Sequence, residues 1–298
     1  MPIDLFNVAS NLIVLGLLEG AIYSLFALGL SLIFGVMKIF NIAHGDMGIL
    51  GGYLCYWVFV MYGIDPILAL VLVLPLLCLI AFCVQRFMIN PAIRDPRFQI
   101  IASVMITYGI ALCISNQEII IWTPDWRSLT LPYSYLSYSI FGLTLNITRV
   151  IVLLFTVAVT IFLLVLLRTK FGKALRACTQ DREVSMLMGI NFGKLAWVAF
   201  AIATAISGIA GMLYTLSHTF YPAVGLVLTI KSLTVMVFGG MGSISGAFVG
   251  GILLGVAEAV VAFSLGGEYR DLVSFLVLVM VLLFKPTGIF GKVFLVPK

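Results

Sequence analysis

The sequence predicts an all-α polytopic membrane protein, and its composition and the length of its apolar runs predict this independently. Of the 298 residues, 62% are hydrophobic and 10% are charged, and the mean hydropathy is +1.21. Ordinary soluble domains carry about a quarter charged residues, so this composition excludes them. The apolar runs continue for about twenty residues, as transmembrane helices do, whereas barrel strands alternate over about ten. We therefore expect a single transmembrane domain over residues 1–298.

About nine membrane spans are predicted. They cover approximately residues 12–34, 47–62, 67–84, 98–121, 150–167, 195–214, 224–237, 246–265 and 272–284. Counts of eight or ten stay open, because the segment that carries Lys231 could be re-entrant. The first segment has no basic residue and no cleavage site of small residues, which favours a first span over a removable signal.

The distribution of basic residues predicts the orientation. One side holds Lys38, three arginines of the 86–97 loop, six of the seventeen Lys and Arg residues in segment 168–194, and three lysines after the last span. The other side holds Arg127, Arg149 and Arg270, and the segment from His218 to Gly225 is expected to surface there. Cytoplasmic loops are rich in Lys and Arg, so we expect the N-terminus outside and the C-terminus in the cytoplasm. Topology then accounts for the net charge of +5, and no nucleic-acid partner is expected.

Segment 168–194 is the one long polar interruption of the second half, and we interpret it as a cytoplasmic coupling loop. Asp181 is placed to cap a short helix, and Gly189 is placed just beyond its end. Between them, Val184, Leu187 and Met188 share one helical face, on which a soluble partner could push. The alternative is a solvated loop that only satisfies the charge bias.

Several polar residues fall within apolar runs and are candidates for a translocation path. Asn41, His44 and Asp46 lie between two runs, which indicates a broken helix or a tight cytoplasmic turn. Glu19 faces either a substrate path or the outer headgroups, and Glu118 is expected to reach outer water. Two candidate ligands, two residues apart, are too few for a metal site, and the five scattered cysteines suggest packing. The path candidates are Glu19, Asn41, His44, Asp46, Lys231, Gly239, Gly240, Gly242, Ser243 and Glu258.

The glycine-rich stretch 231–255 predicts two closely packed helices joined by a turn near Gly239 to Gly246. It is not a phosphate-binding loop, because GxxxxGK[ST] is absent. Small residues recur at helical spacing in the first and sixth spans, where other helices can pack closely. AHGDMGILGG and FGGMGSISGAFVGG resemble each other weakly, which suggests either an inverted internal repeat or chance similarity.

Three stretches together resemble a known family. GLSLIFGVMKIFNIAHGDMGILGGYL, FGKALRACTQDREVSMLMGIN and LTIKSLTVMVFGGMGSISGAFVGGILLGVAE are similar, in order and spacing, to the LivH-type permeases. The resemblance covers nearly the whole chain and implies a single permease domain. The chain departs from the usual sequence of the family at Asn41-Ile42-Ala43, Cys178 and Gln180. It implies that segment 168–194 docks on ATP-binding subunits, through Gly172, Lys173, Arg176, Asp181, Arg182, Glu183, Val184, Leu187, Met188 and Gly189.

This resemblance implies the permease subunit of an ABC importer of branched-chain amino acids in a bacterial inner membrane. The expected partners are a homologous LivM-like permease, two ATP-binding subunits, a periplasmic binding protein and membrane lipid. ATP and Mg²⁺ would be bound by the partners, so we expect neither a cofactor nor a catalytic residue in this chain. Relatives that carry urea or short amides are one alternative, and a stand-alone secondary transporter or channel is another. A membrane enzyme is disfavoured, because no nucleophile, base and orienting group converge in the sequence.

Overall fold

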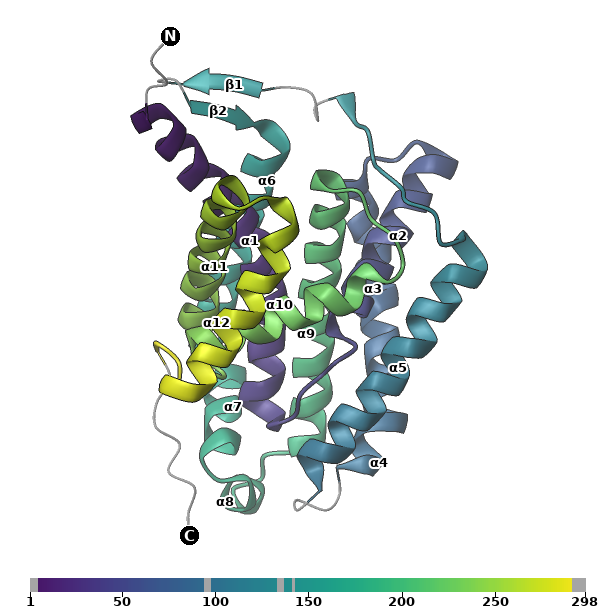
Figure 1. Ribbon diagram of the computed structural model, residues 1–298. Coiled ribbons are helices and arrows are strands. Elements are labelled where there is room, and N and C mark those ends of the chain that lie inside the picture. The colour runs from purple at the N-terminus through teal and green to yellow at the C-terminus, as the bar shows by residue number, and fades with distance from the viewer. Residues whose placement is uncertain (1–4, 94–97, 133–136, 141–142, 291–298) are drawn as a thin grey trace.

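The computed structural model describes residues 5–93, 98–132, 137–140 and 143–290 as a helical bundle (Figure 1). The first half contains α1 (Leu5–Met37), α2 (His44–Tyr62), α3 (Pro66–Cys83), the π-helix η1 (Val84–Ile89), α4 (Asn90–Ala92) and α5 (Gln99–Trp122). The second half contains β1 (Ser137–Ile140), β2 (Leu143–Asn146), α6 (Ile147–Leu166), α7 (Lys170–Gln180), α8 (Arg182–Leu187), α9 (Phe192–Ser217), α10 (Val224–Gly239), α11 (Ile244–Ser264), the 3₁₀ turn η3 (Gly267–Tyr269) and α12 (Arg270–Phe284).

Six helices are long and apolar enough to cross a membrane, which confirms the predicted helical membrane protein. They are α1, α3 (with η1 and α4), α5, α6, α9 and α11. Nine spans remain a prediction, since that count also needs the shorter or less apolar α2, α10 and α12. The antiparallel pair β1 and β2 is an addition to the predicted all-α fold, and it lies at the end of the bundle opposite α7 and α8 (Figure 1).

Helices α1 and α9 form the centre of the bundle, with 72% of the most apolar window of each buried, against 22% for α5 and α6. Small residues explain this central packing. A Cβ atom at Gly20 would lie 2.5 Å from the carbonyl oxygen of Gly251 in α11, and one at Gly211 would lie 1.8 Å from that of Gly48 in α2. Both predicted small-residue stripes are thus confirmed as helix contacts.

Two helices begin inside the bundle. Nε2 of His44, the first residue of α2, lies 3.0 Å from the carbonyl oxygen of Phe26. Phe26 precedes the end of α1 by eleven residues, or about 16 Å at 1.5 Å per residue, half of a hydrocarbon core about 30 Å thick. Gly225 at the start of α10 packs directly against Asp46 in the first turn of α2. The broken-helix alternative is therefore the right one, and a second break follows α9.

The segment from His218 to Gly225 is where one prediction was wrong. It was expected to surface on the outer side, but Phe220 is fully buried and pairs with the backbone of Arg127. From there the chain continues inward to the start of α10, because Gly225 has no side chain and can meet α2 closely. Glu118 was also misplaced: it is buried, and neither carboxylate oxygen has a hydrogen-bond partner among the described residues.

The packing has the pattern of an inverted repeat. Helix α1 packs against α10 and α11, and α9 packs against α2 and α3, so exchanging α1, α2 and α3 with α9, α10 and α11 preserves these contacts. Helix α1 runs toward the end that holds α7, whereas α9 runs away from it (Figure 1). In this arrangement, the break at residues 38–43, before α2, corresponds to the break at residues 218–223, before α10. The glycine stretch 239–246 forms the predicted turn between α10 and α11 and corresponds instead to the turn after α2.

Candidate functional site

The coupling loop folds into two helices, of which the sequence predicted one. The Asp181 carboxylate accepts a hydrogen bond from the backbone N–H of Val184 at 3.0 Å, and Gly189 follows α8 with a φ of +85°. The predicted cap and stop are thus confirmed. Helix α7 was missed, although Phe171, Ala174 and Cys178 recur at helical spacing and indicate an amphipathic helix.

Helix α7 is fastened to the inner end of α1. Its Leu175 and Cys178 side chains are buried. The hydroxyl of Thr179 donates a hydrogen bond to the carbonyl oxygen of Gly35 at 2.9 Å. Arg176 donates from Nη2 to the carbonyl oxygen of Leu167 at 3.0 Å and thereby ties α7 to the end of α6. A displacement of α7 therefore acts directly on two long helices.

Helix α8 presents its apolar side chains away from the protein. Val184, Leu187 and Met188 are 54%, 86% and 80% exposed. The side chain of Ser185 is buried and donates to the carbonyl oxygen of Asp181 at 2.6 Å. Met186 is exposed as well. Four exposed apolar side chains outside the spans are unusual on a solvated loop and suit a docking surface. Arg182 and Glu183 belong to α8, and their side chains are outside the described part of the structure.

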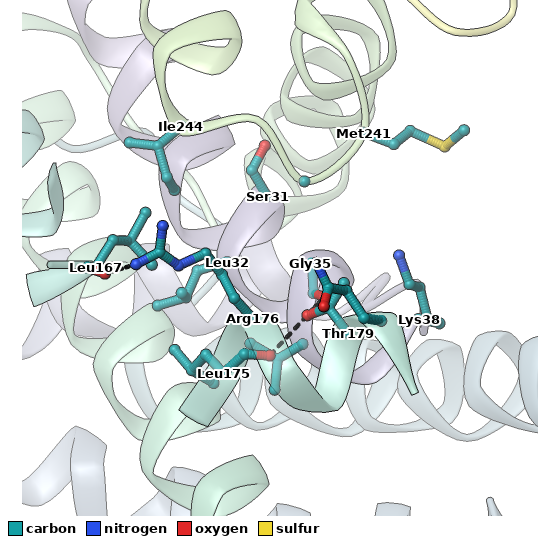
Figure 2. A pocket seen from close by; sticks show the side chains of 13 residues that line it. Ser31, Leu32, Gly35, Lys38, Leu167, Leu175, Arg176, Thr179, Met241 and Ile244 are labelled. Atoms are coloured by element: carbon teal, nitrogen blue, oxygen red, sulfur yellow. Dashed lines mark hydrogen bonds between the residues drawn. The ribbon is translucent and has the colours of Figure 1, made fainter. Parts of the chain in front are cut away.

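A cavity of about 670 Å³ separates α7 from the glycine turn (Figure 2). Its walls come from the inner end of α1, from α7 and from the turn between α10 and α11. Arg176 of the predicted coupling set and Gly242 of the predicted path line it together. The space allows α7 to move relative to the turn, since the two are not packed against each other there.

At mid-depth, the polar residues of the first break hold the broken backbone. The side-chain oxygen of Asn41 accepts from the N–H of Ala43 at 3.1 Å. The hydroxyl of Ser207 donates to the carbonyl oxygen of His44 at 2.6 Å, and the N–H of Gly45 donates to the hydroxyl of Thr229 at 2.8 Å. Such bonds are needed because irregular backbone inside a membrane must satisfy its polar groups internally.

Lys231 is the centre of a buried ionic cluster. Its Nζ atom lies 3.0 Å from Glu258, 3.0 Å from Oδ1 of Asp271 and 3.1 Å from the hydroxyl of Tyr23. Tyr23 and Ser274 each donate a hydrogen bond to Glu258. Of the predicted path residues, Lys231 and Glu258 are therefore brought together. Tyr23, Asp271 and Ser274 were missed, since only the tertiary packing of α1, α10, α11 and α12 joins them.

The remaining path candidates lie elsewhere. Glu19 is buried, lies 3.0 Å from Nε2 of His218 and forms an ion pair with Arg149 at 3.5 Å. Gly239, Gly240, Gly242 and Ser243 form the inner turn, where the hydroxyl of Ser243 accepts from the N–H of Gly246 at 3.0 Å. The structure thus distributes the predicted path over four places. In the described part of the chain, no three His, Cys, Asp or Glu side chains gather as metal ligands would.

The structure is a multi-pass helical bundle of the membrane-protein class, with two helices that begin inside it and an exposed apolar helix, α8, at one end. The sequence matches a family described as the branched-chain amino acid transport system / permease component over residues 12–282, and the chain belongs to this family. No solved structure matches it.

The alignments with three relatives cover nearly all of this chain and of each relative. The chain is 30% identical to the high-affinity branched-chain amino acid transport system permease protein BraD of Pseudomonas aeruginosa, over 93% of this chain and 94% of that protein. It is 31% identical to LivH of Salmonella typhimurium, again over 93% and 94%. It is 28% identical to a probable branched-chain amino acid transport permease protein LivH of Methanocaldococcus jannaschii, over 92% of both.

Proposed function

We propose that this chain is the permease subunit of an ATP-driven importer that carries branched-chain amino acids across a bacterial inner membrane. The partners are a homologous second permease, two ATP-binding subunits that hold ATP and Mg²⁺, and a periplasmic binding protein that delivers the substrate. Family membership and the names of the relatives support branched-chain amino acids as the substrate class.

The exposed apolar face of α8 is the observation that carries this proposal. A protein that works alone has no need for Val184, Leu187 and Met188 in water, whereas an ATP-binding subunit can bury them. The push would pass from α8 to α7, and from α7 to α1 through Thr179 and Gly35. Helix α1 contacts α10 directly, and it contacts α9, which packs against α2. Its displacement would therefore reach α2 and α10, the two helices that begin inside the bundle.

The proposed orientation places α7 and α8 in the cytoplasm. Lys170, Lys173 and Arg176 lie at that end of the bundle, as does Lys38 after α1. Arg127, Arg149 and Arg270 lie near the opposite end, where α5 and α9 finish. The positive-inside rule supports this assignment, which puts the N-terminus outside and the C-terminus in the cytoplasm.

The test is transport by a reconstituted system. The permease, the second permease and the ATP-binding subunits encoded beside it are placed in liposomes with ATP inside and the binding protein outside. We expect uptake of radiolabelled leucine that requires ATP and the binding protein. Uptake of urea or amides instead of leucine would contradict the substrate class. Leucine uptake by this chain without ATP-binding subunits would contradict the importer.

A further inference from the structure

A second cavity, of about 260 Å³, opens between α1, the segment after α9, α10 and the start of α12. It lies away from the coupling helices, in the half of the bundle where α9 ends and α12 begins (Figure 1). Its lining includes Tyr23, His218, Tyr221, Leu228, Lys231 and Asp271. This volume is below the range of about 300–1,000 Å³ of drug-sized ligand sites, and it suits a small molecule.

The charged wall of this cavity contains an unequal ion pair. The side chain of Lys231 is 8% exposed, whereas that of Asp271 is 70% exposed. Glu258 alone balances Lys231 from inside the protein, at 3.0 Å and with its own side chain 3% exposed. Asp271 is therefore a second carboxylate beside the Lys231 ammonium, which already pairs with Glu258. Asp271 approaches this ammonium from the solvent-exposed side. Asp271 can move away without leaving the buried Lys231 ammonium unpaired, because Glu258 remains its partner.

A further donor stands beside this pair. Arg270 lines the same cavity, and its Nε atom is buried without a hydrogen-bond partner among the described residues. A guanidinium group is well suited to binding a carboxylate. On the same face of α10 as Lys231, Val224, Val227 and Leu228 supply apolar surface to the cavity. Trp126 and Tyr221 add an aromatic pair with centroids 4.2 Å apart.

We propose that this cavity binds an amino acid as a zwitterion, on its way from the binding protein to the broken helices. The α-carboxylate takes the place of Asp271 at Lys231 and reaches Arg270, and the α-ammonium pairs with the released Asp271. The apolar side chain then lies against Val227 and Leu228. This assignment rests on the proposed function and deepens it, because it names the chemical feature that the permease itself recognises.

The exchange explains why a zwitterion fits and an uncharged solute does not. A zwitterion separates Lys231 from Asp271 but gives each an opposite charge, so each of the two side chains keeps an ionic partner. Urea or a short amide would separate the same two side chains and offer only dipoles. Such solutes do not replace the lost attraction between Lys231 and Asp271, so they should bind more weakly than a zwitterion.

The test uses the full-length permease alone, in lipid nanodiscs. Cys78, Cys83 and Cys113 are replaced by Ala, and Val227→Cys supplies a thiol at the cavity wall. Its rate of modification by a methanethiosulfonate reagent is measured with leucine, 4-methylpentanoate, isoamylamine or urea. The acid lacks the ammonium and the amine lacks the carboxylate. Thr219→Cys, also on the lining and exposed, is a second reporter should Val227→Cys fold poorly.

We expect leucine to protect the thiol at concentrations at least about tenfold below those of either single-charge analogue, and urea not to protect it. Asp271→Asn should raise the half-protecting concentration of leucine about tenfold, equivalent to about 1.4 kcal/mol. Glu268→Gln is the matched control, because Glu268 is exposed nearby but does not line the cavity, and it should change nothing. Equal protection by an analogue or urea, or no protection by leucine, overturns the proposal. Leucine uptake by the reconstituted importer that persists despite such a result leaves the proposed function standing.

Discussion

The hydroxyl of Thr179 in α7 donates a hydrogen bond to the carbonyl oxygen of Gly35 in α1 at 2.9 Å. The two residues are 144 positions apart in the chain, and their contact joins α7 to α1, the central helix of the bundle. Thr179 also donates to the carbonyl oxygen of Leu175 at 2.8 Å, so the hydroxyl is shared between α7 and α1.

Thr179→Val removes this hydroxyl and keeps the shape of the side chain. We expect a stability loss of about 1 kcal/mol and a lower number of leucine molecules carried per ATP hydrolysed, because α7 is less firmly joined to α1. Uptake and phosphate release are measured together in proteoliposomes. Thr179→Ser retains the hydroxyl and should behave as wild type. If Thr179→Val has the wild-type ratio, this hydrogen bond does not transmit the movement.

The glycine turn gives a second prediction. Gly246→Leu should strongly reduce the yield of folded, detergent-extractable protein, because a Cβ atom there would lie 2.1 Å from the carbonyl oxygen of Gly239. Gly240→Leu and Gly242→Leu should do the same, since the φ angles are +108° and +81°. Gly109→Leu is the control, because no atom lies within 4 Å of its Cβ position. Size-exclusion profiles that are the same for Gly246→Leu and Gly109→Leu would contradict this packing.

The buried ionic cluster should respond asymmetrically to substitution. Lys231→Met alone is expected to destabilise by about 3–5 kcal/mol, because it leaves the buried Glu258 carboxylate uncompensated. Glu258→Gln should cost less, because Asp271 still pairs with Lys231. The double variant should lose less than the sum of the single losses, since both charges are then absent. Thermal unfolding in detergent measures these differences. Losses that simply add would show that Lys231 and Glu258 do not stabilise each other.

Accessibility tests the orientation. In a chain with Cys83 and Cys113 replaced by Ala, Glu268→Cys should react with an impermeant maleimide added outside whole cells, and Gln180→Cys should react only after the membrane is opened. Both positions are exposed, so reactivity depends on the side of the membrane. A position 134 probe would serve the same purpose, but Ser134 lies outside the described residues. External labelling at Gln180 would reverse the topology.

The sequence predicted the features that depend on neighbouring residues. The six long spans follow from apolar run length, and α8 follows from a cap at Asp181 and a stop at Gly189. Helix α7 was missed because its lysines and arginines were interpreted as topology signals, although its buried face is visible in the spacing. The exposed apolar side chains of α8 were predicted correctly, because the helix is short and its cap and stop lie within its own sequence.

Features that depend on tertiary packing could not be predicted. Glu118 lies near the end of α5, where water is the reasonable expectation, and only the packing of α2 against α5 buries it. Lys231 and Asp271 are forty residues apart, and no local pattern pairs them. The second break was missed because the segment that contains Phe220 and Gly225 has the sequence of a surface loop. Its contacts with Arg127 and Asp46 are formed only by tertiary packing.

The most direct test of the coupling surface is Leu187→Asp. Leu187 is 86% exposed and outside the spans, so the variant should insert and fold normally. Truncating one interface anchor commonly costs about 2 kcal/mol or more, a factor of about thirty in affinity. In liposomes with the ATP-binding subunits, Leu187→Asp is therefore predicted to lose co-purification and ATP-driven leucine uptake, whereas Leu187→Met should retain both. Wild-type binding and uptake by Leu187→Asp would contradict the assignment of α8 as the coupling surface.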